Sequence, residues 1–330
     1  MKNILSVCSL DEMHLFPSEK IWLRNSMDRY GFSHLLAGVI GIRAPKRSFC
    51  NWVHGWVWWE SIMKHVDIIM IGPTQLSNDV PIIVATDYER KIINDQKFKN
   101  QIYVGGLPFA YCPDLNVKKQ HNTLLAVLAH SAEAEIHDVL DEDYLDYLHS
   151  IKDKWESIYV LIYYLDKNEE LVKAIEKRGL QVIEGANPYD KFSLLRTKLI
   201  FTLADAVNSN VMGSHIAYAL ACNCKVSLTD NLYSYDRSVT LKANQGLPLN
   251  DIERRIYAAS SEYLKEHFNY LFVNPSQSKR NKDLGQKFIG HKNVLSNKSL
   301  KKALGWNLSQ QVSGFTKGFF RRSKRIIFTK

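Results

Sequence analysis

The sequence predicts an α/β protein of two domains, each a parallel sheet covered by helices, followed by a basic helical tail. The chain has 330 residues, more than one hydrophobic core needs, so two domains of roughly 150 residues each are expected. Short apolar runs alternate with helix-like segments in both halves, as in parallel sheets with crossover helices. The C-terminal residues are strongly basic. The expected segments are 1–116, 117–275 and 276–330.

The first half contains four expected strands and one unusual aromatic segment. The aromatic segment, Cys50–Glu60, holds four of the seven tryptophans, which could fill a core or line a groove for a sugar. Gly105–Pro108 then breaks regular structure, and the domain boundary follows it. The expected strands are Ile4–Cys8, Ile68–Ile71, Ile82–Ala85 and Gln101–Val104.

The second half alternates strands and helices more regularly. Right-handed crossovers would place its strands in one parallel sheet. The expected strands are Thr123–Ala129, Tyr159–Tyr164, Gln181–Glu184, Asp205–Ser209 and Lys225–Leu228. The expected helices are Tyr144–Trp155, Asn168–Arg178, Asp190–Leu203 and Ser214–Cys222.

Composition and cysteine usage argue against several classes of protein. Hydrophobic residues make up 45% and charged residues 23% of the chain, which is ordinary for a globular protein. No apolar run approaches the roughly 18 residues of a membrane span. The N-terminus, Met1–Val7, fits a strand better than a secretory signal, so a cytoplasmic protein is expected. The five cysteines are odd in number and scattered, which predicts reduced core residues and no metal site.

Positive charge is concentrated near the C-terminus. Residues 271–330 hold 14 Lys and Arg against one acidic residue. Within them, 315–330 interleaves cations with aromatic side chains, a pattern that can bind an anionic membrane surface. A solvated end of the chain is the alternative. No nucleic-acid-binding signature accompanies the charge, so nucleic acid is not an expected partner.

Polar residues follow two expected strands of the second half. His130 and Ser131 end the first of these strands, and the loop Ser209–His215 joins a later strand to a helix. Ligands of open parallel sheets bind at the carboxyl ends of strands, and a helix N-terminus accepts phosphate. Gly213 permits close approach and Ser214 offers a hydroxyl, although a simple turn and helix cap would use the same residues. The glycine spacing fits neither a Walker loop nor a dinucleotide fingerprint, so ATP hydrolysis and NAD binding are not expected.

The segment Leu203–Val226 resembles the donor-site signature of GT-B glycosyltransferases. In these enzymes a short strand, a Ser/Gly loop and a small-residue helix hold the donor phosphate. The turn is usually Gly-Lys-Pro-Val there and is Asn223–Val226 here. The resemblance implies two Rossmann-like domains that face a central cleft, with no bound cofactor and a nucleotide sugar as substrate. The donor-binding residues it implies are His130, Ser131, Glu184, Ser209, Asn210, Gly213, Ser214 and His215.

Two further similarities concern the donor and the pathway. His130-Ser131 stands where bacterial sialyltransferases and related transferases of ulosonic acids carry a His-Pro pair that touches cytidine monophosphate. A CMP-sugar is therefore slightly favoured over a UDP-sugar, although serine replaces proline. Leu304-Gly305-Trp306 is similar to the ends of proteins from surface-polysaccharide gene clusters. The acceptor implied is a glycan or a lipid-linked glycan of surface polysaccharide or lipopolysaccharide.

Three residues are candidates for the catalytic base. His54, followed by Gly55, resembles a His-Gly that faces the cleft in enzymes of this plan, and imidazole titrates near neutrality. A histidine packed among tryptophans is the alternative. Asp11 and Glu60 are the acidic candidates. Glu184, before Gly185, could contact the ribose or base, or could merely precede a turn.

The predicted function is a metal-independent glycosyltransferase. A nucleotide-sugar 2-epimerase or a polyol-phosphate transferase of the same fold is the second hypothesis, and an epimerase would need no acceptor. A third is a non-enzymatic membrane-peripheral scaffold that uses the basic tail.

Overall fold

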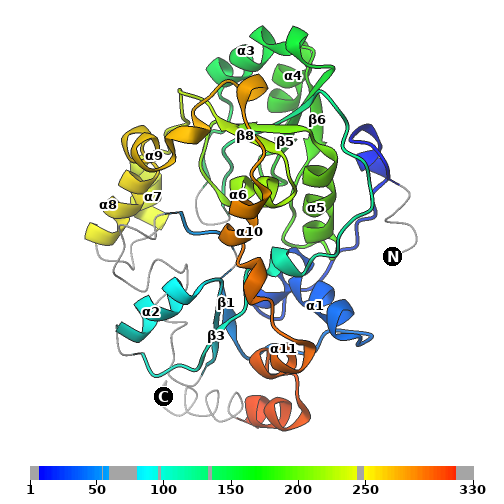
Figure 1. The fold of residues 1–330 in the computed structure, drawn as a ribbon, viewed down its shortest axis with the longest axis vertical. Helices are drawn as coiled ribbons and strands as arrows, with labels where there is room; N and C mark the ends of the chain where they lie inside the picture. Colours follow the sequence, from blue (N-terminus) through cyan, green and yellow to red (C-terminus); the bar gives the residue numbers. More distant parts are fainter. Residues whose placement is uncertain are drawn as a thin grey trace, which may run out of the picture.

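The computed structural model contains two parallel sheets with helices around them (Figure 1). It describes residues 7–53, 55–58, 80–95, 98–132, 136–243 and 249–316. The α/β class predicted from the sequence is confirmed. Within the described segments, no helix is both long and apolar enough to cross a membrane.

The larger sheet has five parallel strands in the order β6-β5-β4-β7-β8. β4, the first of these strands in the sequence, therefore lies in the middle. β5 and β6 follow it on one side and β7 and β8 on the other, so the strand order reverses between β4 and β7. Register pairs Leu125 with Tyr159 and Val127 with Ser209. The strands are β4 (Thr123–Val127), β5 (Ser157–Ile162), β6 (Gln181–Glu184), β7 (Ala206–Ser209) and β8 (Lys225–Leu228).

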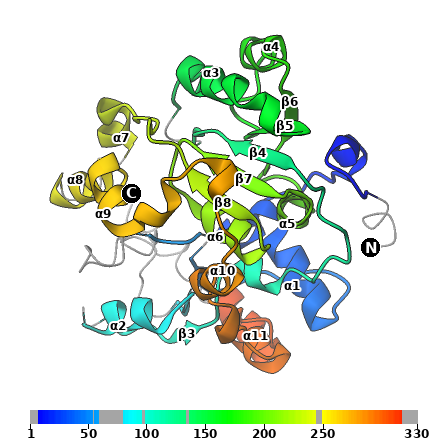
Figure 2. The ribbon, with the colours of Figure 1, turned by 45° about the horizontal axis from the view of Figure 1, so that its top comes forward.

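Helices cover both faces of this sheet (Figure 2). Alternate residues of β4 point to opposite faces, so Leu124 packs with α3 and α4 while Leu125 packs with α5 and α6. Asp141 and Asn168 cap α3 and α4 by accepting backbone N–H groups. The helices are α3 (Glu142–Ser150), α4 (Glu169–Lys177), α5 (Ser193–Leu203) and α6 (Ser214–Ala221).

The smaller sheet has three parallel strands in the order β1-β2-β3. They are β1 (Asn51–Trp52), β2 (Ile82–Val84) and β3 (Ile102–Val104), with α1 (Phe32–Ile40) and α2 (Asp87–Asp95) nearby. β2 and β3 confirm two predicted strands. β1 forms inside the tryptophan-rich segment, where no strand was predicted. The predicted strand Ile68–Ile71 lies outside the described residues, as do 4–6 of Ile4–Cys8, and Cys8 itself is not in a strand.

Described segments near the two ends of the chain link the sheets, because the N-terminal one contacts the larger sheet and the C-terminal one contacts both. Near the N-terminus, Ile21 N–H donates to the carbonyl of Tyr189 at 2.8 Å, beside the larger sheet. Near the C-terminus, α10 packs on α6, whereas Phe49 N–H donates to the carbonyl of Leu304 at 3.0 Å, beside the smaller sheet. One hydrophobic cluster includes residues of both sheets, among them Val84 and Val207. The domain boundaries and the central cleft therefore stay predictions.

The remaining helices lie after β8. They are α7 (Arg237–Ala243), α8 (Leu249–Ala258), α9 (Ser261–Phe268), α10 (Lys282–Phe288) and α11 (Asn297–Ala303). A further helical segment spans 308–316. Short 3-10 turns occur at Asp11–Leu15, Ser26–Gly31, Pro108–Tyr111, Lys152–Lys154, Asn269–Leu271, Pro275–Gln277 and His291–Asn293.

Candidate functional site

The two polar strand ends predicted from the sequence lie side by side. β4 and β7 are adjacent strands, and Val127 pairs with Ser209 near their carboxyl ends. The loops that follow are joined by a hydrogen bond from Ala129 N–H to Asn210 Oδ1 at 3.1 Å. This position is the point of the sheet where the strand order reverses, at which loops diverge and open α/β sheets bind their ligands.

Ser209 and Asn210 hold this edge of the sheet together. Both are fully buried. Ser209 Oγ donates to the carbonyl of Val127 at 2.8 Å, and Asn210 Nδ2 donates to Asp141 Oδ2 at 2.8 Å. Because their polar atoms are engaged within the protein, the contacts give both residues a positioning role. Direct contact with a donor phosphate stays a prediction for them.

Ser131 is buried in the same way, whereas His130 is exposed. Ser131 N–H donates to Asp166 Oδ2 at 3.0 Å, and its Oγ accepts from His137 N–H at 3.0 Å. These bonds fix the turn after β4. The exposed imidazole of His130 therefore stands on a rigid backbone.

The N-terminus of α6 has no side-chain cap. Gly213 is the N-cap residue and is extended, and no side chain accepts a hydrogen bond from the first turn. The first N–H groups of an α-helix have no intrahelical acceptor and carry partial positive charge, which suits an anion. Ser214 Oγ accepts a hydrogen bond from Trp56 N–H at 2.9 Å. The segment after β1 of the smaller sheet therefore lies directly on this helix end.

Each of the two loops carries a histidine, His130 and His215, and the two interact electrostatically. The charge of His130 contributes to the pKa of His215, which burial lowers first and most, from 6.5 to about 3. His215 Nε2 lies 3.0 Å from Ser209 Oγ. His215 is consequently neutral at pH 7, so its ring can accept or donate a hydrogen bond beside an anion but adds no charge.

Two tyrosines that the sequence did not single out complete the edge. The ring of Tyr163 lies 4.8 Å from that of His130, and its hydroxyl lies 3.1 Å from the hydroxyl of Tyr30. Tyr30 adopts a left-handed backbone conformation with φ 57° and is anchored by a bond from its N–H to the carbonyl of Pro188 at 2.9 Å. The tyrosine pair that follows β5 could have been found as another strand end. Nothing in the sequence places Tyr30 here.

Of the other predicted residues that the structure describes, only Glu184 lies at this edge of the sheet, where it pairs with Ile162 on β5, two strands away from β7. Asp11 accepts a hydrogen bond from the hydroxyl of Tyr159 at 2.8 Å, and its neighbour Leu10 donates to Gln120, just before β4 begins. Glu184 is exposed at the end of the outer strand β6 and pairs with Lys167 at 2.9 Å. His54 and Glu60 lie outside the described residues.

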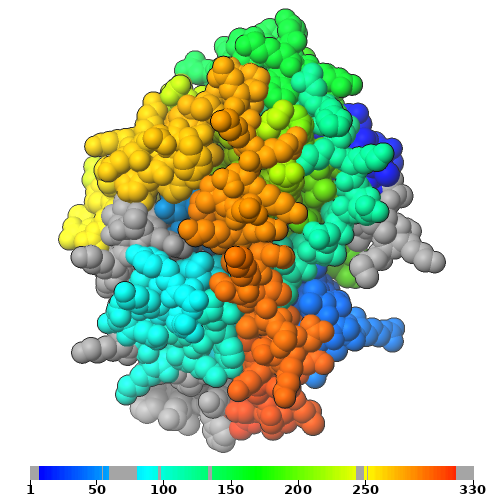
Figure 3. All heavy atoms as spheres, in the orientation of Figure 1, coloured from blue at the N-terminus to red at the C-terminus, as the bar shows by residue number. Residues whose placement is uncertain are grey.

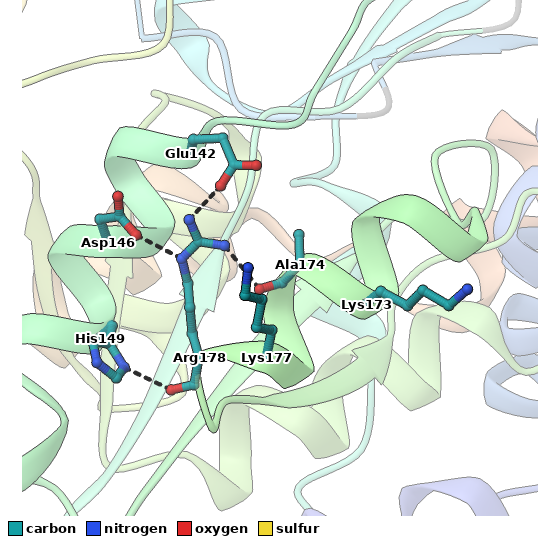
Figure 4. Close-up of a pocket in the computed structure, with 7 residues that line it drawn as sticks. All are labelled: Glu142, Asp146, His149, Lys173, Ala174, Lys177 and Arg178. Carbon is teal, nitrogen blue, oxygen red and sulfur yellow. Dashed lines mark hydrogen bonds and ion pairs between the residues drawn. The ribbon is translucent and has the colours of Figure 1, made fainter.

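Two further features of the described residues bear on ligand binding. No group of three or more His, Cys, Asp and Glu side chains gathers there in a way that could hold a metal ion. A hollow of about 490 Å³ lies elsewhere, between α3 and α4. Figure 4 shows that Arg178 reaches from α4 to Glu142 and Asp146 on α3. These bonds hold the two helices together, and none of the residues that line the hollow belongs to the two strand-end loops.

Comparison with known proteins gives one structural similarity to report. No family model matches the sequence, and no curated protein matches it. Five solved chains match, among them a mutant of TarM from S. aureus in complex with fondaparinux, alpha-GlcNAc-glycerol and UDP. The similarity to TarM has a TM-score of 0.29 at 15% identity, and covers 70% of this chain. The chain spans 43% of the length of TarM. At this level the likeness does not determine an activity.

Proposed function

We propose that the chain is a glycosyltransferase that moves a sugar from a nucleotide-activated donor to a glycan or lipid-linked acceptor. One observation carries the proposal. The uncapped N-terminus of α6 opens at the reversal point of the larger sheet, and the segment of Gly55 and Trp56 from the smaller sheet lies against it. A phosphate bound there would have one sheet behind it and the other sheet beside it.

The proposed chemistry uses the helix end to stabilise the departing nucleotide. Backbone N–H groups of Gly213 and Ser214 would donate to the donor phosphate, and the helix dipole would favour the negative charge that develops as the glycosidic bond breaks. His130 would contact the nucleotide from the neighbouring strand end. His54 or Glu60 would take the proton from the acceptor hydroxyl, whereas the bond of Asp11 to Tyr159 holds that carboxylate away from the two strand ends. Metal-independent transfer, a CMP rather than a UDP donor, and surface-polysaccharide or lipopolysaccharide synthesis are parts of the same proposal.

The location and partners are proposals as well. A cytoplasmic enzyme with a lipid-linked acceptor would reach that acceptor more readily when bound to the inner face of the plasma membrane. The sequence predicts that residues 315–330 make this contact with the membrane. Of these, 317–330 lie outside the described residues.

The test is turnover of a panel of CMP- and UDP-sugars by the purified chain, with and without glycan acceptors. Release of the nucleotide that depends on an acceptor is the expected result. Turnover of the donor without any acceptor would point to an epimerase instead. Failure to bind or turn over every nucleotide sugar in the panel would contradict the proposal.

A further inference from the structure

A second surface lies at the end of the molecule formed by α1, α11 and the helix over 308–316, opposite α3 and α4 (Figure 1). Along this helix, Leu308 is 78% exposed, Val312 61% and Phe315 55%. Their spacing of four and three residues places the three side chains on one helix face. A contiguous apolar face in contact with solvent is typical of an interaction site.

The helix is attached firmly to the body of the protein. Gln311 Nε2 donates to the carbonyl of Arg47 at 2.9 Å and to that of Gly305 at 2.6 Å. On the same side, Gly314 packs so closely on Phe49 that an added Cβ would lie 2.5 Å from its ring. The exposed apolar face therefore has a fixed position beside the loop that contains Arg47.

The surroundings of the helix over 308–316 are cationic. The loop after α1 contributes Arg43, Lys46 and Arg47, and Lys46 Nζ donates to the carbonyl of Trp306 at 3.0 Å. α11 adds Lys298, Lys301 and Lys302. Neither 29–59 nor 284–330 contains an Asp or a Glu. Figure 3 shows the blue α1 segment and the orange-red C-terminal segment in contact at the lower end of the molecule.

Asp28, the carboxylate that Arg24 links to this loop, does not offset the positive charge of the surface. Arg24 donates to the carbonyl of Pro45 and also pairs with Asp28 at 2.8 Å. Asp28 is 2% exposed, so its charge is buried and already paired. Two acid-free segments that are far apart in the sequence thus combine into one cationic surface around an apolar face.

We infer that this surface binds an anionic phospholipid bilayer. Its cations contact lipid phosphates, while Leu308, Val312 and Phe315 enter the boundary of the acyl chains. A second copy of the chain fits less well, because it would bring two cationic surfaces together. Nucleic acid would engage the cations but leave the apolar face exposed. The inference does not depend on the proposed transfer reaction.

The experiment is co-sedimentation of the full chain with phosphatidylcholine vesicles, prepared with and without phosphatidylglycerol. We expect binding only to the anionic vesicles. Replacing Leu308→Ser and Val312→Ser together abolishes it, whereas Leu249→Ser, which removes another exposed leucine at α8, does not. A triple change of Arg43, Arg47 and Lys302 to Ala weakens binding about fivefold for each cation removed.

A matched triple change of Lys154, Lys173 and Lys177 to Ala, at the opposite end, serves as the charge control. Circular dichroism and thermal unfolding show whether each variant remains folded. Absence of vesicle binding overturns the inference, and so does binding that both sets of changes leave intact, because another part of the chain then carries it. A concentration-dependent dimer that Leu308→Ser disperses in size-exclusion chromatography also overturns it, in favour of self-association.

Discussion

His215 links the candidate site to pH. Burial holds its pKa near 3, below its ordinary value of 6.5. Between pH 6.5 and 3, the imidazole is therefore protonated in the unfolded chain but not in the folded one. The contribution of neutral His215 to the free energy of unfolding, present above pH 6.5, is lost as the pH falls toward 3. The loss from this one group is at most about 1.4 kcal/mol per pH unit.

The variant His215→Gln removes this proton while keeping an amide that can bond Ser209. The difference in unfolding free energy between the native chain and the variant should then change steadily below pH 6.5, with the native chain losing relative stability. Urea unfolding at a series of pH values measures it. Parallel profiles for the two proteins would show that burial does not depress the imidazole.

At this scale the sequence predicts which residue types gather but not which atoms face a ligand. Ser209, Asn210, Gly213 and His215 lie at the predicted strand end. However, two of them are fully buried with their polar atoms bonded internally. A loop sequence does not reveal that difference, because it depends on the carbonyl of Val127 in β4 and the carboxylate of Asp141 before α3. Tyr30 is in place through contacts with Tyr163 and Pro188, which are distant in the sequence.

At the scale of elements, the segment after β1 and the start of α6 are tightly fitted. A Cβ added to Gly55 would lie 2.3 Å from Ser214 Oγ but 3.5 Å from Ser214 Cβ. The hydroxyl could avoid the new methyl group only by rotating away, which would break its bond to Trp56 N–H. The loss of stability caused by Gly55→Ala should therefore depend on the hydroxyl of Ser214.

A double-mutant cycle of Gly55→Ala and Ser214→Ala checks this fit. We expect Gly55→Ala to destabilise the native chain by about 1–3 kcal/mol, and to cost clearly less when Ser214→Ala is already present. The coupling should be about 1 kcal/mol or more, as for residues in direct contact. Additive effects would mean that the two elements do not touch as described.

The contact of α10 with α6 provides a second test. A Cβ added to Gly285 would lie 2.1 Å from the backbone N of Ala221, and no side-chain rotation relieves a clash with backbone. Gly285→Ala should therefore lower stability by about 1–3 kcal/mol or more. Gly38 in α1 has nothing within 4 Å of its added Cβ, so Gly38→Ala should raise stability by about 0.5–1 kcal/mol. Thermal or urea unfolding compares them, and equal effects would contradict the packing.

Elements of the second half were predictable because local signals agree there. β4 is buried along its whole length and reads as a continuous apolar run, and Asn168 caps α4 where the sequence predicts a helix start. β1 was missed because two residues form it within a tryptophan-rich segment that shows no alternation. β1 is extended because it pairs with β2, a contact that the local sequence does not indicate.

At the scale of the whole molecule, segments near the two ends of the chain connect the two sheets. Residues near Ile21 bond to the larger sheet's neighbour Tyr189, and residues near Leu304 bond to Phe49 beside the smaller sheet. Length and alternation predicted the two sheets, but not these long-range contacts, because no periodic pattern specifies them. The two sheets also share a hydrophobic cluster, and Trp56 N–H bonds to Ser214 Oγ at the start of α6.

The central claim is that the N-terminus of α6, with His130, binds the phosphate of a nucleotide. Calorimetric titration of the chain with CMP and with UDP tests it most directly. The double variant His130→Ala, Ser214→Ala is compared with His149→Ala, Ser150→Ala, a pair of the same residue types at the end of α3. The account predicts saturable binding of one nucleotide that the first variant weakens at least about tenfold, or about 1.4 kcal/mol, and the second leaves unchanged. Binding of neither nucleotide, or equal affinity in both variants, would contradict it.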